Sequence, residues 1–159
     1  MAQVKIIAVG KLKEQYWAAA QAEYLKRLRP YLKLELIEVP DLPGPERMSP
    51  AEEEQLRTKE AEAIARFIDA RDYLVALDVA GKQFSSPELA DFFRERDLNG
   101  EAVTLVIGGS LGLAADLVHR AKLRLSFSKL TFPHQLFRVM LLEQVYRACK
   151  IGRGEPYHK

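Results

Sequence analysis

Segments with the pattern of buried strands alternate with segments of helical spacing along almost the whole chain. Short runs rich in Val, Ile and Leu predict strands, and longer segments with apolar residues three or four positions apart predict helices. Strands are expected at residues 4–10, 32–39, 73–79, 102–107 and 123–127, and helices at 16–28, 50–68, 86–96, 114–121 and 133–150. Because this alternation is typical of crossover connections, the sequence predicts an α/β fold with a mostly parallel sheet.

Serine, proline and glycine mark several element boundaries. Ser49-Pro50 followed by glutamates predicts a capped helix start, and Ser86-Pro87-Glu88 repeats that signature with Ser86 as the cap. Residues 40–50 hold four prolines and a glycine, which predicts an irregular loop. Ala80-Gly81-Lys82 is expected to end the third strand.

The length of 159 residues is that of one domain, and such a domain can fold without a disulfide or a metal. Cys149 is the only cysteine, which excludes a disulfide framework and a multi-cysteine metal site and fits a reducing cytosol. The longest uncharged stretch, residues 102–115, is too short to span a bilayer, and residues 1–7 lack the pattern of a secretory signal. We therefore expect a cytoplasmic protein with no membrane partner.

The net charge of +2 conceals an uneven distribution. Residues 1–33 hold seven Lys or Arg and two Glu, and residues 119–159 hold nine Lys or Arg and two Glu. Residues 34–118 hold eight Lys or Arg and eighteen Asp or Glu. Two basic ends could form one basic face, as a nucleic-acid-binding protein needs, or they could be solvated surface charge. The charge pattern leaves both interpretations open.

The glycine-rich segment Gly108–Gly112 lies between an apolar strand and a helix. In parallel sheets, ligands bind beyond the carboxyl ends of the strands, where glycine lets backbone groups approach closely. The spacing matches neither the dinucleotide fingerprint nor a P-loop. The segment therefore predicts either a site for a nucleotide-like ligand or a tight strand-to-helix turn.

The last predicted helix carries apolar side chains on nearly every side, a pattern that predicts burial on every side. In a domain this small, one side can pack on the sheet and another on a second copy of the chain. We therefore predict a homodimer with this helix, including Leu141, in the interface. The alternative is a helix wrapped by its own chain.

Arg138 lies within an apolar arc of that helix, and a buried guanidinium must be paired. Its partner could be a structural one, such as Asp78 or a loop carbonyl, or it could be a ligand. Glu143, Arg147 and Lys150 share another face of the helix with the spacing of a local ion-pair row, to which no chemistry is assigned.

The tail, residues 151–159, combines two glycines and a proline with an aromatic ring, an imidazole and a cation. Tyr157, His158 and Lys159 suit base stacking, proton transfer and phosphate contact, respectively. A disordered, solubilising terminus is the alternative. Three scattered histidines and one cysteine do not predict a metal site.

Leu105–Ser110, Leu125–Gln135 and the tail Arg153–Lys159 together closely resemble the RlmH family. These are small bacterial SPOUT-superfamily methyltransferases that act on large-subunit ribosomal RNA. Ile6–Lys11 and Leu77–Lys82 resemble that family as well, so the resemblance covers essentially the whole chain.

The resemblance implies a single SPOUT-type domain over residues 1–159, with helices on both faces of the sheet and a C-terminal trefoil knot. The part from about residue 73 to residue 159 would hold the knot, the cofactor loops and the functional tail. The resemblance also implies a homodimer packed through the knotted region and the last helix.

The implied activity is transfer of a methyl group from S-adenosyl-L-methionine (SAM) to N3 of a pseudouridine. The implied acceptor is a 23S rRNA stem-loop at the ribosomal subunit interface, on the assembled ribosome, and no metal is required. Carried over to this chain, the cofactor-binding positions are Leu77, Gly108, Phe127, Ser128, Lys129, Leu130, Thr131 and Phe132.

Methylation at N3 requires loss of an imide proton, which a base or a stabilising cation can assist. His158 is the candidate base or proton relay, Tyr157 would stack on the flipped base or hydrogen-bond to it, and Arg138 would stabilise the anion. Arg153 and Lys159 would bind RNA phosphates.

Three alternatives are considered beside this reading. One is a SPOUT methyltransferase for another RNA base, and one is a non-catalytic, ribosome-associated RNA-binding factor. A third, a nucleotide-binding regulatory domain, depends on the glycine-rich segment alone.

Overall fold

The computed structural model describes residues 2–159, and within them five strands alternate with five helices. In chain order the elements are β1 (Ala2–Val9), α1 (Gln15–Leu28), β2 (Leu32–Val39), α2 (Pro50–Ala65), β3 (Tyr73–Gln83), α3 (Ser86–Leu98), β4 (Val103–Ile107), α4 (Ala115–Arg120), β5 (Leu123–Ser126) and α5 (His134–Gly152). Each strand and helix expected from the sequence is present, with boundaries that differ by a few residues.

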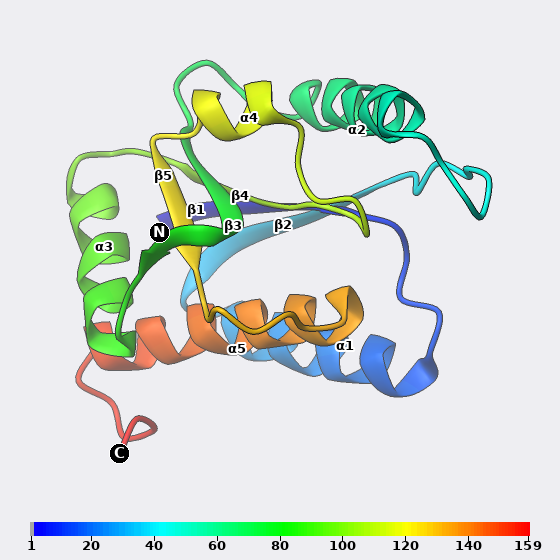
Figure 1. Cartoon of the computed structure of the whole chain (residues 1–159). Coiled ribbons are helices and arrows are strands. Elements are labelled where there is room, and N and C mark those ends of the chain that lie inside the picture. Colours follow the sequence, from blue (N-terminus) through cyan, green and yellow to red (C-terminus); the bar gives the residue numbers. More distant parts are fainter. Residues whose placement is uncertain (1) are drawn as a thin grey trace.

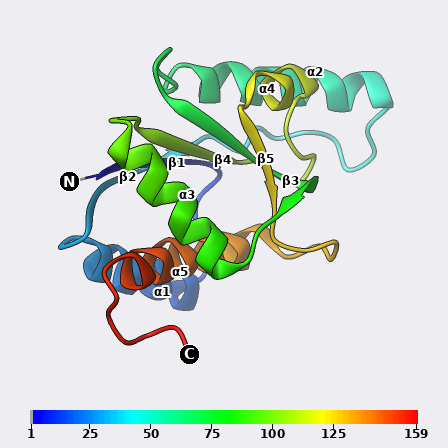
Figure 2. The ribbon, with the colours of Figure 1, turned by 90° about the vertical axis from the view of Figure 1, so that its left-hand side faces the viewer.

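The strands form one sheet in the order β2-β1-β4-β3-β5, and all neighbouring strands pair in parallel. Helices α2 and α4 cover one face of the sheet, and α1, α3 and α5 cover the other (Figures 1 and 2). The prediction of an α/β fold with a mostly parallel sheet and helices on both faces is confirmed. Because the strands are parallel, the loops that follow β4 and β5 can meet beyond one edge of the sheet.

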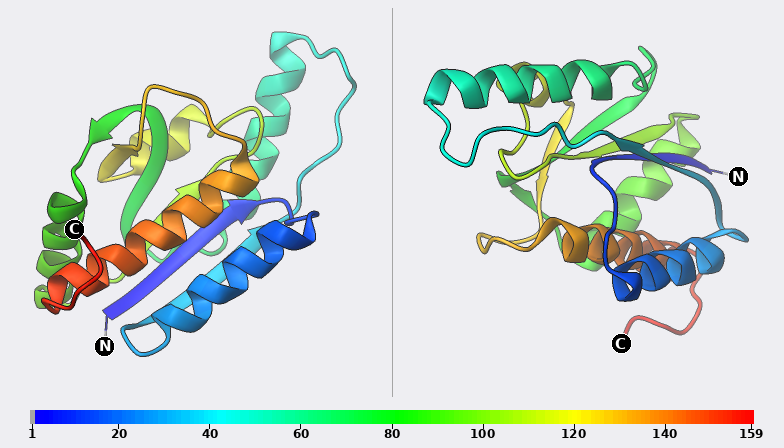
Figure 3. Two further views of the ribbon diagram at one scale, coloured as in Figure 1. Left: turned by 90° about the horizontal axis from the view of Figure 1, so that it is seen from below. Right: turned by 90° about the vertical axis from the view of Figure 1, so that its right-hand side faces the viewer.

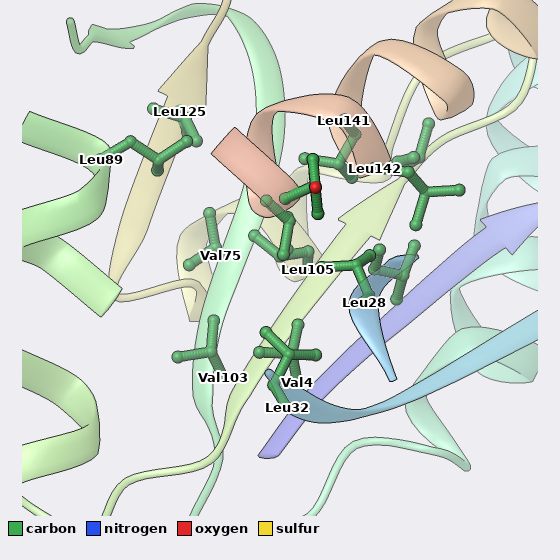
Figure 4. Close-up of a cluster of buried hydrophobic side chains, with 14 of the residues drawn as sticks. Val4, Leu28, Leu32, Val75, Leu89, Val103, Leu105, Leu125, Leu141 and Leu142 are labelled. Carbon is green, nitrogen blue, oxygen red and sulfur yellow. The ribbon is translucent and has the colours of Figure 1, made fainter. Parts of the chain in front are cut away.

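Two hydrophobic cores lie on the two faces of the sheet, because side chains alternate between faces along each strand. The core beneath α1, α3 and α5 includes Val75, Leu105, Leu28, Leu89, Leu141 and Leu142 (Figure 4). The core beneath α2 and α4 includes Ile7, Val106, Ile64 and Leu117. Burial of each such side chain stabilises the fold by about 1.5–3 kcal/mol relative to exposure.

Reciprocal serine–glutamate caps begin α2 and α3. The Ser49 hydroxyl accepts a hydrogen bond from the Glu52 N–H, while the Glu52 carboxylate accepts one from the Ser49 N–H. Ser85 and Glu88 make the same pair of bonds. The cap expected at Ser86 is therefore at Ser85, because only Ser85 stands three residues before a glutamate that can close the box.

β3 continues to Gln83, past the end expected at Ala80-Gly81-Lys82. Its pairing with β5 breaks after Leu77 and resumes at Lys82, so the residues between them leave the ladder. A Cβ atom on Gly81 would lie 2.6 Å from the backbone carbonyl carbon of Arg124. The glycine thus permits a close approach of two strands, where the sequence suggested an ending.

Helix α5 lies between α1 and α3 on its face of the sheet (Figure 3). Leu141 is only 1% exposed and belongs to the core of its own chain, so the prediction that it faces a second copy is wrong. Its position along α5 directs it toward the sheet. Leu136, Val139 and Met140 are among the half-buried apolar residues of α5 that a second copy could cover.

Two negative findings concern residues 2–159. No helix in this range has both the length and the apolar composition needed to cross a membrane. Within the same range, no three His, Cys, Asp or Glu side chains gather as a candidate metal-ion site.

Candidate functional site

A pocket opens where the interrupted segment of β3 and the loops after β4 and β5 meet the first turn of α5. Seven of the eight positions expected to bind a cofactor line it: Leu77, Gly108, Phe127, Ser128, Leu130, Thr131 and Phe132. Lys129 does not line the pocket and is exposed to solvent. Three segments far apart in the sequence therefore converge on one concave surface.

The glycine-rich loop forms a backbone wall of this pocket. A Cβ atom on Gly108 would lie 2.8 Å from the carbonyl carbon of Gly112, so no larger residue fits there without displacing the loop. Gly109 and Gly112 form an isolated β-bridge, and the Gly112 N–H donates to the Gly109 carbonyl at 3.0 Å. From α2, the Arg57 guanidinium donates to the carbonyl of Leu111 at 3.4 Å. The loop is thus a tight turn that also faces the pocket, so both roles considered for it are compatible.

A second wall comes from the interrupted segment of β3. Leu77, Asp78 and Val79 line the pocket where the pairing with β5 breaks. The Asp78 carboxylate accepts a hydrogen bond from the Ala80 N–H at 3.1 Å, which stabilises the local turn. The irregularity in β3 therefore directs three consecutive residues toward the site.

The third wall is the loop between β5 and α5. The Ser126 hydroxyl donates to the Ser128 carbonyl at 3.1 Å, and the Ser128 hydroxyl accepts from the Leu130 N–H at 3.0 Å. Phe127 lies 5.0 Å from Phe137 between ring centroids, and Phe132 stacks on the same ring at 6.4 Å with an interplanar angle of 13°. The two serine hydroxyls fix the loop, and the aromatic rings make its surface apolar.

Sequence reasoning missed several lining residues, among them Asp78, Val79, His134 and Phe137. Asp78 and His134 are the titratable groups among the described residues that line the pocket. His134 and Phe137 stand three residues apart in the first turn of α5, so their shared helix face was a usable signal. Asp78 and Val79 directly follow Leu77, and only the break in the strand turns them toward the site.

Arg138 lies outside the pocket and is 3% exposed. Its guanidinium donates hydrogen bonds to the Glu38 carboxylate, to the Gly10 carbonyl at 2.9 Å and, more weakly, to the Gln21 amide oxygen at 3.5 Å. These contacts match the structural pair considered for this residue, with Glu38 and a loop carbonyl as the partners. Asp78, the carboxylate suggested from the sequence, is not the partner.

The tail folds back on the second half of α5 and does not reach the pocket of its own chain. The Tyr157 hydroxyl donates to Glu143 at 3.0 Å, and the Tyr157 ring packs edge-on against Tyr146. Burial and the hydrogen bond to Glu143 raise the pKa of Tyr157 to about 12. His158 Nδ1 lies 3.2 Å from the Arg147 guanidinium. Tyr157 and His158 thus lie side by side on α5.

The two residues expected to bind phosphate lie in different settings. Arg153 stacks over Tyr31 at 4.5 Å from the ring centroid and donates to the Pro30 carbonyl at 3.2 Å. Lys159 is exposed, and no hydrogen bond or ion pair joins it to the residues the structure describes. Arg153 is therefore partly committed to its own chain, whereas Lys159 is free to meet an anion.

The pocket suits a ligand with one flat apolar part and several hydrogen-bonding edges. Its walls combine leucine and phenylalanine side chains with loop backbone and three hydroxyl groups, from Ser126, Ser128 and Thr131. Small-molecule sites commonly have this mixture of apolar walls and a few placed polar groups. A purine nucleoside with a charged extension has the matching chemistry.

Comparison with known protein families matches nearly the entire chain. A family model described as "Predicted SPOUT methyltransferase" matches residues 2–158. A protein of Carboxydothermus hydrogenoformans named ribosomal RNA large subunit methyltransferase H is 52% identical over 158 residues, covering 99% of each chain. A Desulfitobacterium hafniense protein of the same name is 48% identical over 160 residues and covers both chains fully.

Two solved structures share the fold at low sequence identity. A probable methylase family protein from Haemophilus influenzae matches 99% of this chain and 71% of its own, with a TM-score of 0.55 and 11% identity. TrmJ from Z. mobilis matches 100% of this chain and 73% of its own, with a TM-score of 0.54 and 17% identity.

Proposed function

The chain belongs to the SPOUT methyltransferase family, and from that premise we propose that it transfers a methyl group from SAM to N3 of a pseudouridine in 23S rRNA. The proposed acceptor is a stem-loop at the subunit interface of the assembled ribosome. The proposal takes residues 1–159 as a single domain in a cytoplasmic homodimer, with a trefoil knot between about residues 73 and 159. The full-length relatives named ribosomal RNA large subunit methyltransferase H support this assignment.

The observation that carries the proposal is the convergence of three chain segments on one pocket. Seven positions that the family resemblance assigns to the cofactor come from three separate segments of the chain and line one pocket. Positions from three separate segments would not be expected to line the same pocket by chance. The convergence therefore supports this pocket as the SAM site.

The pocket residues fit SAM by their chemistry. When bound, SAM supplies an electrophilic methyl group on a sulfonium centre, so the protein needs mainly to position it and exclude water. Leu77, Phe127 and Phe132 would hold the adenine between apolar surfaces. Backbone groups of the Gly108–Gly112 loop would pair with its polar edge, because the glycines let the ligand approach the main chain.

The acceptor nitrogen must lose its imide proton before or during methyl transfer. His158 is the proposed base or relay. Because a guanidinium cannot accept a hydrogen bond, Nδ1 of His158 accepts from Arg147, and Nε2 carries the proton of the neutral ring. His158 can take up a proton at Nδ1 once it leaves Arg147. With a pKa of about 12, the phenol of Tyr157 stays protonated, which suits stacking and hydrogen-bond donation.

The tail is proposed to serve the pocket of the partner subunit. In its own chain, Tyr157 is held at Glu143, six residues along α5 from Phe137, the nearest pocket residue on that helix, a separation of about 9 Å at 1.5 Å per residue. A tail supplied by a second copy removes this separation. Lys159 is the proposed phosphate contact, and Arg138 is assigned to the fold because its guanidinium already binds the Glu38 carboxylate and the Gly10 carbonyl.

The test is transfer of labelled methyl from SAM to undermodified ribosomes, run beside isolated large subunits, naked rRNA and bulk tRNA. We expect label only on the assembled ribosome, mapped to N3 of one pseudouridine. Label on a different base would favour a SPOUT methyltransferase with another RNA acceptor. Absence of both label and SAM binding would favour the non-catalytic ribosome-associated factor.

A further inference from the structure

The C-terminal tail leaves α5 through a defined turn. Gly154 has a φ of +66°, and its N–H donates to the Ile151 carbonyl at 3.0 Å. The Glu155 N–H donates to the Lys150 carbonyl, also at 3.0 Å. This pair of bonds around a left-handed glycine is the Schellman arrangement, which closes the end of a helix and fixes the direction of the next residues.

The side chain of Glu155 then ties the tail to the opposite end of the sequence. Its carboxylate accepts hydrogen bonds from the Tyr31 hydroxyl at 2.6 Å and from the Lys150 ammonium at 2.8 Å. These two donors lower the pKa of Glu155, so the carboxylate is charged at neutral pH. Tyr31 stands just before β2, 124 residues from Glu155 in the chain.

Cations on both sides reinforce the Tyr31 contact. Arg153 lies 4.5 Å from the centroid of the Tyr31 ring, and Lys150 lies 5.5 Å from it. Cation–π contacts of this kind add to the hydrogen bond and restrict the ring. We call Tyr31 and Glu155 the tail pin.

We propose that the tail pin positions Tyr157 and His158 for methyl transfer. The proposal rests on the proposed function of the tail. Ordering a free backbone costs about 1–2 kcal/mol for each residue, so a tail already held in one path reaches the reaction with part of that entropy lost beforehand. Tyr31 and Glu155 touch neither the cofactor pocket nor the tip of the tail, so both are positioning residues.

The experiment uses the full-length Tyr31→Phe and Glu155→Gln variants. Tyr31→Phe removes a single hydroxyl, and Glu155→Gln removes the charge while keeping the shape. Tyr16→Phe is the matched control, because Tyr16 is 63% exposed and its hydroxyl has no hydrogen-bond partner among residues 2–159. Three quantities are measured: kcat and KM for undermodified ribosomes at saturating SAM, the Kd for SAM, and the NMR signal of the His158 ring.

In both pin variants we expect kcat/KM for ribosomes to fall about tenfold, the size expected for one hydrogen bond to a charged group. The Kd for SAM should stay within about twofold of the wild-type value, and the His158 signal should move toward that of a free histidine. The kcat/KM of the double variant should be no lower than that of the more impaired single variant, because both substitutions break the same contact. Tyr16→Phe should match the wild type in all three measurements.

Wild-type kinetics with an unmoved His158 signal in both pin variants would overturn the proposal. Equal losses of SAM affinity and methyl transfer would also overturn it, because they indicate a general structural role. A variant chain that ends at Pro156 tests the proposed function of the tail independently of the tail pin. If that chain transfers methyl groups at the wild-type rate, the tail has no catalytic role, whatever the pin variants do.

Discussion

Replacing Arg138 with methionine is expected to lower the free energy of unfolding by about 3 kcal/mol and to leave SAM affinity unchanged. The guanidinium is 3% exposed and pairs with Glu38 and with the Gly10 carbonyl. Breaking a fully buried ion pair costs about 3–5 kcal/mol. Because the Glu38 side chain is 32% exposed, we reduce its share to about 2 kcal/mol and add about 1 kcal/mol for the unpaired carbonyl.

The assay is urea unfolding at one fixed protein concentration, because the stability of the proposed dimer would depend on concentration. The fluorescence of Trp17, the only tryptophan, reports the transition. A loss of about 3 kcal/mol corresponds to a fall in Tm of about 6–12 °C for a chain of this size. Adding Glu38→Leu to Arg138→Met should restore part of the loss, since the second substitution removes the unpaired charge.

A loss below about 1 kcal/mol would refute the structural assignment of Arg138. Unchanged stability together with lost methyl transfer would instead support a substrate contact for the Arg138 guanidinium. The double variant supplies the internal check, because a purely catalytic arginine gives no energetic coupling to Glu38.

Three further predictions concern the pocket, the dimer and a buried carboxyl group. Gly108→Ala should weaken SAM binding at least tenfold by calorimetry, because the added Cβ would lie 2.8 Å from the backbone of Gly112. Gly152→Ala is the control and should bind SAM with wild-type affinity, because a Cβ there meets nothing within 4 Å. Equal affinities of the two variants would refute this prediction. If the proposed homodimer packs through α5, Met140→Glu should give monomers in sedimentation analysis, and an intact dimer would exclude α5 from the interface. Burial raises the pKa of Glu60, so its contribution to stability falls as pH rises above the ordinary value of 4.5. The Tm of Glu60→Gln relative to wild type should therefore rise from pH 4.5 upward, and a flat or falling difference would contradict it.

Local patterns predicted the elements of this fold well. The alternation of strand and helix, the Ser49 cap and the strand at residues 32–39 follow from neighbours a few positions apart, and the structure has them. The errors arose where contacts with a distant segment determine the local structure. Gly81 suggests a turn in the sequence, but in the structure it lies against the backbone of Arg124 and allows β3 to continue. No local window contains that contact.

The candidate site divides in the same way. The glycine-rich loop could be suspected from the sequence alone, whereas the eight cofactor positions came from the family resemblance. The Glu38 partner of Arg138 lies 100 residues away, and the Tyr31 partner of Glu155 lies 124 residues away. The sequence contains many other carboxylates, so only the strand order and the path of the tail identify Glu38 and Glu155 as the partners of Arg138 and Tyr31.

The strand order also has a consequence for synthesis of the chain. β1 pairs with β2 on one side, but its other neighbour, β4, ends about 70 residues after β2. At 5–20 residues per second, one edge of β1 waits roughly 3–14 s before its partner has been translated. An open apolar strand edge is a template for aggregation, so the nascent chain needs shielding during that interval. Slower translation between the codons for β2 and β4 is expected to lower the soluble yield.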